Sequence, residues 1–422
     1  MSKAAKITLV LLPAILWVPV ALFLSFEGVW MTPVAEPNDH NEFMAYAKMA
    51  VSDNLKGNGA LILLEEGKVV GRHYHNAAAN NANNANNEST ALTVNGDTLF
   101  PAASMSKLIA AVSIHTLAQQ EKISVNSAVE RYIKRWKLPE SAFDHEQVTI
   151  ARLLSHTAGL TDGLGFGDYT EDESVPGLIE TLNNPRSSND EKQVAVGLSP
   201  GTEFKYSGGS YLLLELLVED ITGDRYESWV THNILKPRGL ARSNFNFIAS
   251  SENSTPIYDS AGQQVAAFQY ASSAATALNT SANDLVALLQ SIIAEPQLVN
   301  ALSTPMATVM GAPIWGQGAM LYAPLSDGQF VIGHDGSNDP AINTSIRVNP
   351  ITGDGYIALF SGHKTLASEI GFEWVLWQSG KPDFIFSNKA INASVIPILV
   401  GSLGWIILMV VYLRVSKKAK RK

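Results

Sequence analysis

Residues Asp97–Gln120 read DTLFPAASMSKLIAAVSIHTLAQQ, and this stretch decides how the rest of the chain is interpreted. Its second half repeats apolar residues with the period of a helix. Ser104 and Lys107 stand at the start of that helix, three residues apart, so the lysine amine can approach the serine hydroxyl. A helix start also offers free N–H groups and positive potential. A lysine partly withdrawn from water has a lowered pKa and can act as the base for a serine nucleophile.

This pair alone also fits an ordinary serine cap followed by a surface lysine. Three further blocks follow it: TIARLLSHTAGLTDG at Thr149–Gly163, a block containing SPGTEFKYSGGSY within Ser199–Phe245, and GHDGSNDPAINTSIRVNPITGDGYIALFSGHK at Gly333–Lys364. The four blocks together resemble, in content and order, the serine β-lactamase and penicillin-binding protein superfamily. The branch is that of class C β-lactamases, D-aminopeptidases, D,D-carboxypeptidases and related esterases. The resemblance covers most of the chain, from about Asn58 to Gly362.

The resemblance implies an α/β fold in which an antiparallel sheet is flanked by helices and joined by a helical subdomain, with the site between them. It implies that Ser104 is the acylated nucleophile and Lys107 its general base. Tyr206, in the Y-S-G motif, would share proton transfer with the lysine. A phenol near an ammonium group is expected to have a lowered pKa, which would let it deprotonate a water. No metal or organic cofactor is implied.

The run H-D-G at 334–336 stands where many relatives carry K-T-G. By this resemblance His334 supplies the polar group that faces the active-site tyrosine, and Gly336 completes the motif. The oxyanion hole would use the backbone N–H groups of Ser104 and Ser337. The resemblance gives His156, in LLSHTAGL, a structural role at the wall of the site and not a catalytic one.

Departures from the family pattern shape the expected substrate. Gly208 stands where class C β-lactamases and carboxypeptidases typically have an asparagine that contacts the substrate. The family's Gly-Gly-Leu appears as Thr-Ala-Leu at 276–278, and H-D-G lacks the permanent cation that binds a carboxylate. The partner is therefore expected to be a small-molecule or peptide acyl substrate, such as an ester or a peptidoglycan-related D-amino acid peptide. The alternatives are a β-lactamase proper and a non-catalytic membrane protein that binds a ligand or an envelope partner.

Both ends of the chain carry uncharged apolar blocks, Ile7–Ser25 and Ala393–Leu413, each near the ~20 residues that cross a bilayer. Two lysines precede the first block, and RVSKKAKRK follows the second. The positive-inside rule therefore places both termini in the cytoplasm and the central domain on the periplasmic or extracytoplasmic side of the cell (inner) membrane. The alternative for the first block is a cleaved signal peptide, although its apolar core is long for one.

The composition of the 422 residues agrees with this division. The formal net charge is −9, and it becomes −17 without the two N-terminal lysines and the six cations of the tail. An acidic domain argues against nucleic acid as a partner. The absence of cysteine excludes disulfides, Cys-ligated metals and a thiol nucleophile.

The predicted segments are a membrane anchor at 1–26, a linker with a first helix at 27–57, a hydrolase domain at 58–385, a membrane helix at 393–413 and a basic tail at 414–422. Within the domain, Ala60–His75 predicts two strands and Ser104–Thr222 a helix-rich region. The remainder up to His363 is expected to return to strands, which gives a sheet that joins the two ends of the domain.

Overall fold

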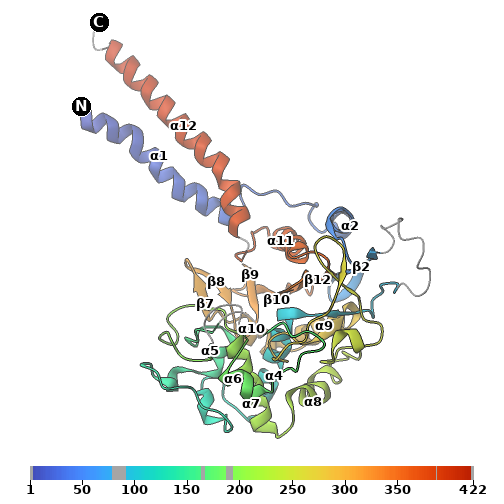
Figure 1. Ribbon diagram of the computed structural model, residues 1–422. Helices are drawn as coiled ribbons and strands as arrows, with labels where there is room; N and C mark the ends of the chain where they lie inside the picture. The colour runs from blue at the N-terminus through green and yellow to red at the C-terminus, as the bar shows by residue number, and fades with distance from the viewer. Residues whose placement is uncertain (1–2, 78–91, 163–166, 187–192, 386, 420–422) are drawn as a thin grey trace.

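The computed structural model describes residues 3–77, 92–162, 167–186, 193–385 and 387–419. Its centre is an eight-stranded antiparallel sheet with the strand order β2-β1-β12-β11-β10-β9-β8-β7 and helices on both faces (Figure 1). The strands are β1 (Gly59–Glu65), β2 (Lys68–His75), β7 (Ala307–Val309), β8 (Ala312–Trp315), β9 (Met320–Pro324), β10 (Phe330–Asn338), β11 (Ile342–Val348) and β12 (Gly355–Ser361).

The sheet joins the two ends of the domain, as the sequence predicted. Strand β1, from the first part of the chain, pairs antiparallel with β12, for example Leu61 with Ala358. Every residue of β11 and β12 is buried because helices cover both faces of the sheet at these central strands. The outer strand β2 alternates between exposed and half-buried positions over most of its length, as expected for a sheet edge.

One face of the sheet is covered by α2 (His40–Asn54) and α11 (Leu366–Ser379). Their aromatic side chains form a separate core with the sheet, in which Phe43 stacks on Trp377 with ring centroids 5.0 Å apart. The predicted first helix therefore packs against the domain, and it does not stand apart from it. The predicted hairpin at Ala60–His75 and this helix are both confirmed.

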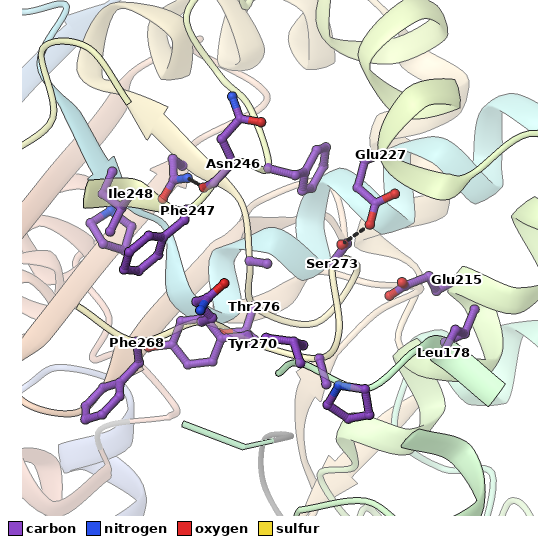
Figure 2. A pocket seen from close by; sticks show the side chains of 18 of the residues that line it. Leu178, Glu215, Glu227, Asn246, Phe247, Ile248, Phe268, Tyr270, Ser273 and Thr276 are labelled. Atoms are coloured by element: carbon purple, nitrogen blue, oxygen red, sulfur yellow. Dashed lines mark hydrogen bonds between the residues drawn. The ribbon is translucent and has the colours of Figure 1, made fainter. Parts of the chain in front are cut away.

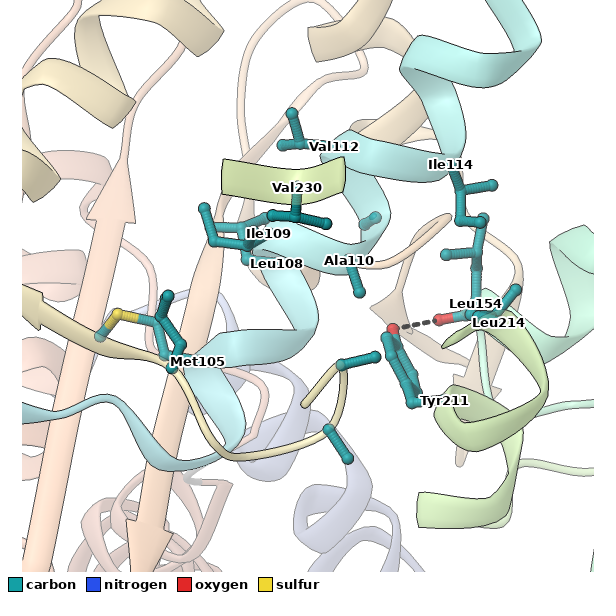
Figure 3. Packing of buried hydrophobic residues seen from close by; sticks show 14 of the residues in the cluster. Met105, Leu108, Ile109, Ala110, Val112, Ile114, Leu154, Tyr211, Leu214 and Val230 are labelled. Atoms are coloured by element: carbon teal, nitrogen blue, oxygen red, sulfur yellow. Dashed lines mark hydrogen bonds between the residues drawn. The ribbon is translucent and has the colours of Figure 1, made fainter. Parts of the chain in front are cut away.

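The larger core lies on the opposite face and surrounds α4 (Ser106–Gln119) and α7 (Gly208–Thr222). Leu108 and Ile109 of α4 lie close to Val230, and the Tyr211 hydroxyl donates a hydrogen bond to the Leu154 carbonyl (Figure 3). Apolar residues surround α4 on nearly all sides, which is typical of a helix in the centre of a core. This burial fixes the position of the residues at its start.

The expectation that strands follow directly after Thr222 was wrong. The longest regular elements in residues 223–306 are helices, and the strands there are only two or three residues long. In one of these helices, Leu285, Leu288, Leu289 and Ile292 repeat at helical spacing and bury one face. The long sheet resumes only at β7. The remaining elements are η1 (Ala103–Met105), η2 (Val129–Arg131), η3 (His145–Gln147), α5 (Ile150–Leu154), α6 (Leu178–Asn183), α8 (Tyr226–Val230), η4 (Thr231–Leu235), η5 (Ile248–Ser250), α9 (Ala282–Ile293), α10 (Pro296–Ser303) and the short strands β3 (Leu99–Pro101), β4 (Ile257–Tyr258), β5 (Gln264–Val265) and β6 (Asn279–Ser281).

Two terminal helices, α1 (Lys3–Phe26) and α12 (Ser387–Ala419), leave the domain together and bring the two chain ends to the same side (Figure 1). Both are long and apolar enough to cross a membrane. They pack along each other, and the Trp17 indole donates to the Pro397 carbonyl at 2.9 Å. Gly401 permits this approach, because a Cβ there would lie 2.1 Å from the indole nitrogen. The helix α12 begins before the predicted span 393–413 and continues into the basic tail.

Candidate active site

Ser104 lies in the tight turn η1, immediately before α4. It is partly exposed, whereas Ala103 and Met105 on either side are buried. Ala103 has a φ of +51°, a conformation that an alanine adopts only at a cost of roughly 1–2 kcal/mol. Strand β10 packs closely against this turn, since a Cβ on Gly336 would lie 2.4 Å from the Ala102 carbonyl oxygen. The packed turn therefore presents one hydroxyl at the surface in a strained backbone.

Lys107 meets Ser104 as the spacing predicted. Its amine donates to the Ser104 hydroxyl at 3.2 Å and to the Ala275 carbonyl at 2.8 Å. The side chain is only 2% exposed. Burial lowers the pKa of Lys107 to about 7, although the charge of Asp162 acts in the opposite direction. A large fraction of this amine is therefore neutral near neutral pH.

Tyr206 is beside the same pair, with its ring centroid 5.0 Å from the Lys107 amine. Burial raises the pKa of Tyr206, and a hydrogen bond with Ser104 only partly opposes this effect. The prediction that an adjacent ammonium group lowers the pKa of this phenol was wrong. The loss of water around the phenol is the largest cause, so the phenol keeps its proton near neutral pH.

His334, on β10, is buried and belongs to the same group. Its Nδ1–H donates to the Asp335 carbonyl at 2.6 Å, which leaves a lone pair on Nε2. Within the described part of the chain, Nε2 has no hydrogen-bond partner. Burial and the charge of Lys107 lower the pKa of His334 to about 3. The side chain that replaces the family lysine is therefore a neutral acceptor and not a cation.

An aromatic wall of His156, Tyr206 and Trp315 encloses these groups. His156 stacks on Tyr206 with ring centroids 4.2 Å apart, and its Nδ1 accepts a hydrogen bond from the Ser207 backbone N–H at 3.1 Å. Burial lowers the pKa of His156 well below its usual value. Trp315 of β8 meets His334 edge-on at 5.3 Å. His156 thus holds the tyrosine in place, which fits its predicted structural role, whereas no sequence motif indicated Trp315.

Asp162 is a second residue that sequence reasoning missed. Its carboxylate accepts hydrogen bonds from the Ser207 hydroxyl at 2.7 Å and from the Gly209 backbone N–H at 2.9 Å, at the start of α7. A Cβ on Gly209 would lie 2.6 Å from this carboxylate, so the glycine leaves room for it. Asp162 stands at the end of the quoted block LLSHTAGLTDG, but only the fold brings it to the helix that carries Tyr206.

The remaining predicted residues, Gly336 and Ser337, lie on strand β10 with His334. Gly336 packs against the turn that carries Ser104, and Ser337 is exposed beyond it, paired in register with Asn343. Asn338 then donates to the Thr276 hydroxyl at 2.8 Å. Segment 272–277 is therefore held by β10 on one side and itself holds Lys107 through the Ala275 carbonyl. The structure brings Ser104, Lys107, Tyr206 and His334 together, while the oxyanion role of Ser337 stays a prediction.

A cavity of about 710 Å³ lies next to segment 272–277, and Figure 2 shows its lining. Aromatic side chains such as Phe268 and Tyr270 line one part of it, and Glu215 and Glu227 lie at another. Glu215 accepts hydrogen bonds from the Ser272 hydroxyl at 3.1 Å and from the Ala274 backbone N–H at 3.0 Å. Burial, with smaller contributions from neighbouring carboxylates, raises the pKa of Glu215 to about 8. This carboxyl therefore steadies the segment that holds Lys107.

Comparison with known proteins supports the resemblance to the β-lactamase and penicillin-binding protein superfamily. A family model described as Beta-lactamase matches residues 51–372. Among solved structures, the octameric penicillin-binding protein homologue from Pyrococcus abyssi superposes with a TM-score of 0.64 and 23% identity, covering 82% of this chain and 78% of the other. The D-amino acid amidase from Ochrobactrum anthropi SV3 gives 0.59 and 17%, covering 79% and 98%. At these identities the likeness shows the fold.

Curated relatives match over shorter stretches. Protein flp of Staphylococcus aureus (strain NCTC 8325 / PS 47) is 29% identical over 150 residues, which is 35% of this chain and 28% of that protein. Penicillin-binding protein 4* of Bacillus subtilis (strain 168) is 26% identical over 187 residues, 43% of this chain and 37% of that protein. The chain thus aligns with well under half the length of these relatives.

Proposed function

Because this chain belongs to the Beta-lactamase family, whose fold is that of serine hydrolases acting on amides, we propose that it is a membrane-anchored serine hydrolase that works through an acyl-enzyme. The contact between Ser104 and Lys107 carries the proposal. A partly exposed hydroxyl lies 3.2 Å from a buried amine whose pKa is about 7. A surface lysine beside a serine cap would keep its charge and could not accept the proton.

The neutral amine of Lys107 has the geometry of a base. One N–H group donates to the Ala275 carbonyl. In the neutral amine the 3.2 Å contact with Ser104 can reverse, so that the nitrogen lone pair accepts the Ser104 proton. The Ser104 oxygen then attacks the substrate carbonyl carbon, and the backbone N–H groups of Ser104 and Ser337 stabilise the oxyanion. The leaving group departs with a proton that comes back through Lys107 and Tyr206. Water then attacks the acyl group, and Ser104 regains its proton.

The substrate class follows from the charge at the site. His334 is neutral, so the position that carries a cation in many relatives offers nothing for a substrate carboxylate to pair with. We therefore favour an ester or a D-amino acid amide over a β-lactam or a free D-Ala terminus. Two structural neighbours named for D-stereospecific amide hydrolysis, the amidohydrolase from Streptomyces and the Ochrobactrum amidase, agree with this preference. A substrate of the bacterial envelope, such as a peptidoglycan-related peptide, fits an extracytoplasmic domain between α1 and α12.

The test is covalent labelling of the full-length protein in detergent with a fluorescent fluorophosphonate. Wild type is expected to label, and Ser104→Ala to give no label. Lys107→Ala should slow labelling by roughly 10²–10⁴-fold, the usual contribution of a positioned base. Ser113→Ala is the matched control, since this buried serine of the same helix donates to the Ile109 carbonyl, away from the site.

Two outcomes would contradict the proposal. Equal labelling rates for wild type and Lys107→Ala would remove the lysine as a base. An unlabelled wild type, inert also toward D-amino acid amides and esters, would indicate a fold that binds without catalysis. Hydrolysis of a chromogenic cephalosporin at a rate above that of D-amino acid amides would instead identify a β-lactamase proper.

A further inference from the structure

The hairpin formed by β7 and β8 presents an unusual apolar tip. Outside α1 and α12, the large apolar side chains that are exposed among the described residues are Val29, Met49, Val70, Val309, Met310 and Ile351. Isolated exposed apolar residues are ordinary on a protein surface. Val309 and Met310, however, are adjacent at one turn, and Met310 is completely exposed.

Methionine is energetically unfavourable in this turn because of the backbone conformation. Val309 pairs with Ala312, and the two residues between them have φ values of +51° for Met310 and +83° for Gly311. Tight hairpin turns with two positive φ angles strongly prefer Asn-Gly or Asp-Gly. Methionine is strained there and gains no packing within the chain. A residue that breaks a local rule in this way is expected to serve a function elsewhere.

The segment of sequence that carries the tip is also uncharged. The sequence carries no charged residue from Pro296 to Ser326. Strand β7 is the last strand of the sheet, and soluble proteins usually protect such an edge with charged side chains. Val309, Met310, Ala312 and Pro313 instead give the turn an apolar surface. The partner of this surface is therefore expected to be apolar.

The position of the hairpin identifies that partner as a lipid bilayer. Shortly before α12 the chain contacts strand β9, the neighbour of β8, where the Phe384 backbone N–H donates to the Tyr322 carbonyl at 2.7 Å. Because Trp315 pairs with Met320, the far end of β9 points in the same direction as the β7–β8 turn. In Figure 1 the hairpin lies in the part of the domain nearest the α1–α12 pair.

We propose that the β7–β8 tip, residues 309–312, inserts into the interfacial layer of the bilayer that α1 and α12 cross. The inference rests on the proposed membrane anchoring. With it, the domain contacts the membrane at the helix pair and at the hairpin, so it cannot turn freely about its tether. Trp315, at the other end of β8, packs against His334 and Tyr206. Two residues separate it from Ala312, a distance of about 10 Å along the strand, so the inference places the site close to the membrane surface.

The chain contains no cysteine, so any introduced cysteine is a unique site for a fluorophore. Met310→Cys is labelled with a nitrobenzoxadiazole probe and reconstituted into vesicles of phosphatidylcholine and phosphatidylglycerol. Doxyl groups placed near the headgroup or near the end of the acyl chain then report depth by quenching. The inference predicts a blue-shifted emission and stronger quenching by the shallow doxyl than by the deep one.

Two control sites separate this inference from the anchoring on which it rests. Leu403→Cys, in the middle of the apolar part of α12, should be quenched by the deep doxyl. Asp224→Cys lies in the turn between α7 and α8, and Figure 1 shows these helices at the end of the domain away from α1 and α12, so this probe should not be quenched. An unquenched probe at Met310 with a quenched probe at Leu403 overturns the hairpin inference alone. An unquenched probe at Leu403 overturns the anchoring and the inference together.

A second variant distinguishes lipid contact from a structural role of the methionine. Met310→Asn gives the turn its preferred Asn-Gly sequence, so it should not lower the unfolding temperature in detergent. When the probe is attached to a cysteine introduced by Val309→Cys, Met310→Asn should reduce quenching by the shallow doxyl group at least two-fold. A lower unfolding temperature with unchanged quenching would assign Met310 to the fold and refute its insertion.

Discussion

The two faces of strand β10 differ in how they accommodate buried ionisable side chains. His334 points to the active site, and Asp335, the next residue, points to the back of the sheet, because successive side chains alternate along a strand. On the site face, burial leaves His334 neutral and gives Lys107 a pKa of about 7. On the back face, the buried Arg347 pairs with Asp335 at 2.7 Å and with Asp383 at 2.5 Å. On the site face, burial favours the neutral forms of the ionisable groups. On the back face, the charged groups are paired with each other.

The back face also ties the sheet to the C-terminal helix. Asp383 lies just before α12, and the Arg347 guanidinium sits 3.9 Å from the ring centroid of Tyr322, whose hydroxyl donates to Asp335 at 3.0 Å. These contacts connect the active-site strand, its neighbours and the segment that leads into the apolar helix. In the proposed mechanism the groups on the site face serve proton transfer, whereas the contacts on the back face hold β10 and the segment that leads into α12.

The largest expected effect comes from removing the ion pairs on the back face. Arg347→Leu would leave the carboxylates of Asp335 and Asp383 buried without a cation, which typically costs about 3–5 kcal/mol. Thermal or denaturant unfolding of the full-length protein in detergent should show this loss. Fluorophosphonate labelling per folded molecule should stay near the wild-type rate, because the change lies behind the strand.

Arg347→Lys is the matched control, because it keeps the charge but cannot pair with both carboxylates in the same geometry. It should be destabilised less than Arg347→Leu. If Arg347→Leu unfolds like wild type, or if it loses labelling in proportion to Lys107→Ala, the two faces do not have separate roles.

The sequence predicted the local half of this arrangement. Ser104 and Lys107 are three residues apart in one helical segment, so their contact follows from the spacing alone. The H-D-G run placed His334 beside them through the family resemblance. Asp335 gave no signal, because its partners Arg347 and Asp383 are distant in sequence and meet it only across the sheet.

Other features depended on burial, which a motif does not encode. The phenol of Tyr206 was expected to have a lowered pKa, but enclosure by the aromatic wall raises it. Trp315 and Asp162 reach the site from separate segments through tertiary packing. The clear strand patterns after residue 330 predicted strands for the whole segment between Thr222 and His363. The helices α8, α9 and α10 instead occupy the first part of that segment.

The site face makes a sharper prediction in its pH dependence. The reactive form has a neutral Lys107, so the labelling rate should fall about tenfold per pH unit below a pKa of about 7 and level off above it. His334 stays neutral over this range because its pKa is about 3, so it should add no second transition. Labelling rates measured from about pH 5 to pH 9 test this profile. A flat profile over that interval would mean that Lys107 is not the titrating base.

A final variant tests whether the stability contributed by a buried carboxyl without a paired cation depends on pH. Glu215 accepts its hydrogen bonds from neutral donors and has a raised pKa of about 8, so it holds a proton in the folded protein that it releases in the unfolded chain. Its contribution to stability is therefore present at low pH and is lost as the pH rises through about 8, by at most about 1.4 kcal/mol per pH unit. Glu215→Gln keeps the acceptor and cannot ionise. The variant should match wild type within about 1 kcal/mol at low pH and become the more stable protein in alkali. Unfolding curves that stay parallel across this range would show that Glu215 is ionised in the folded state and has a cationic partner after all.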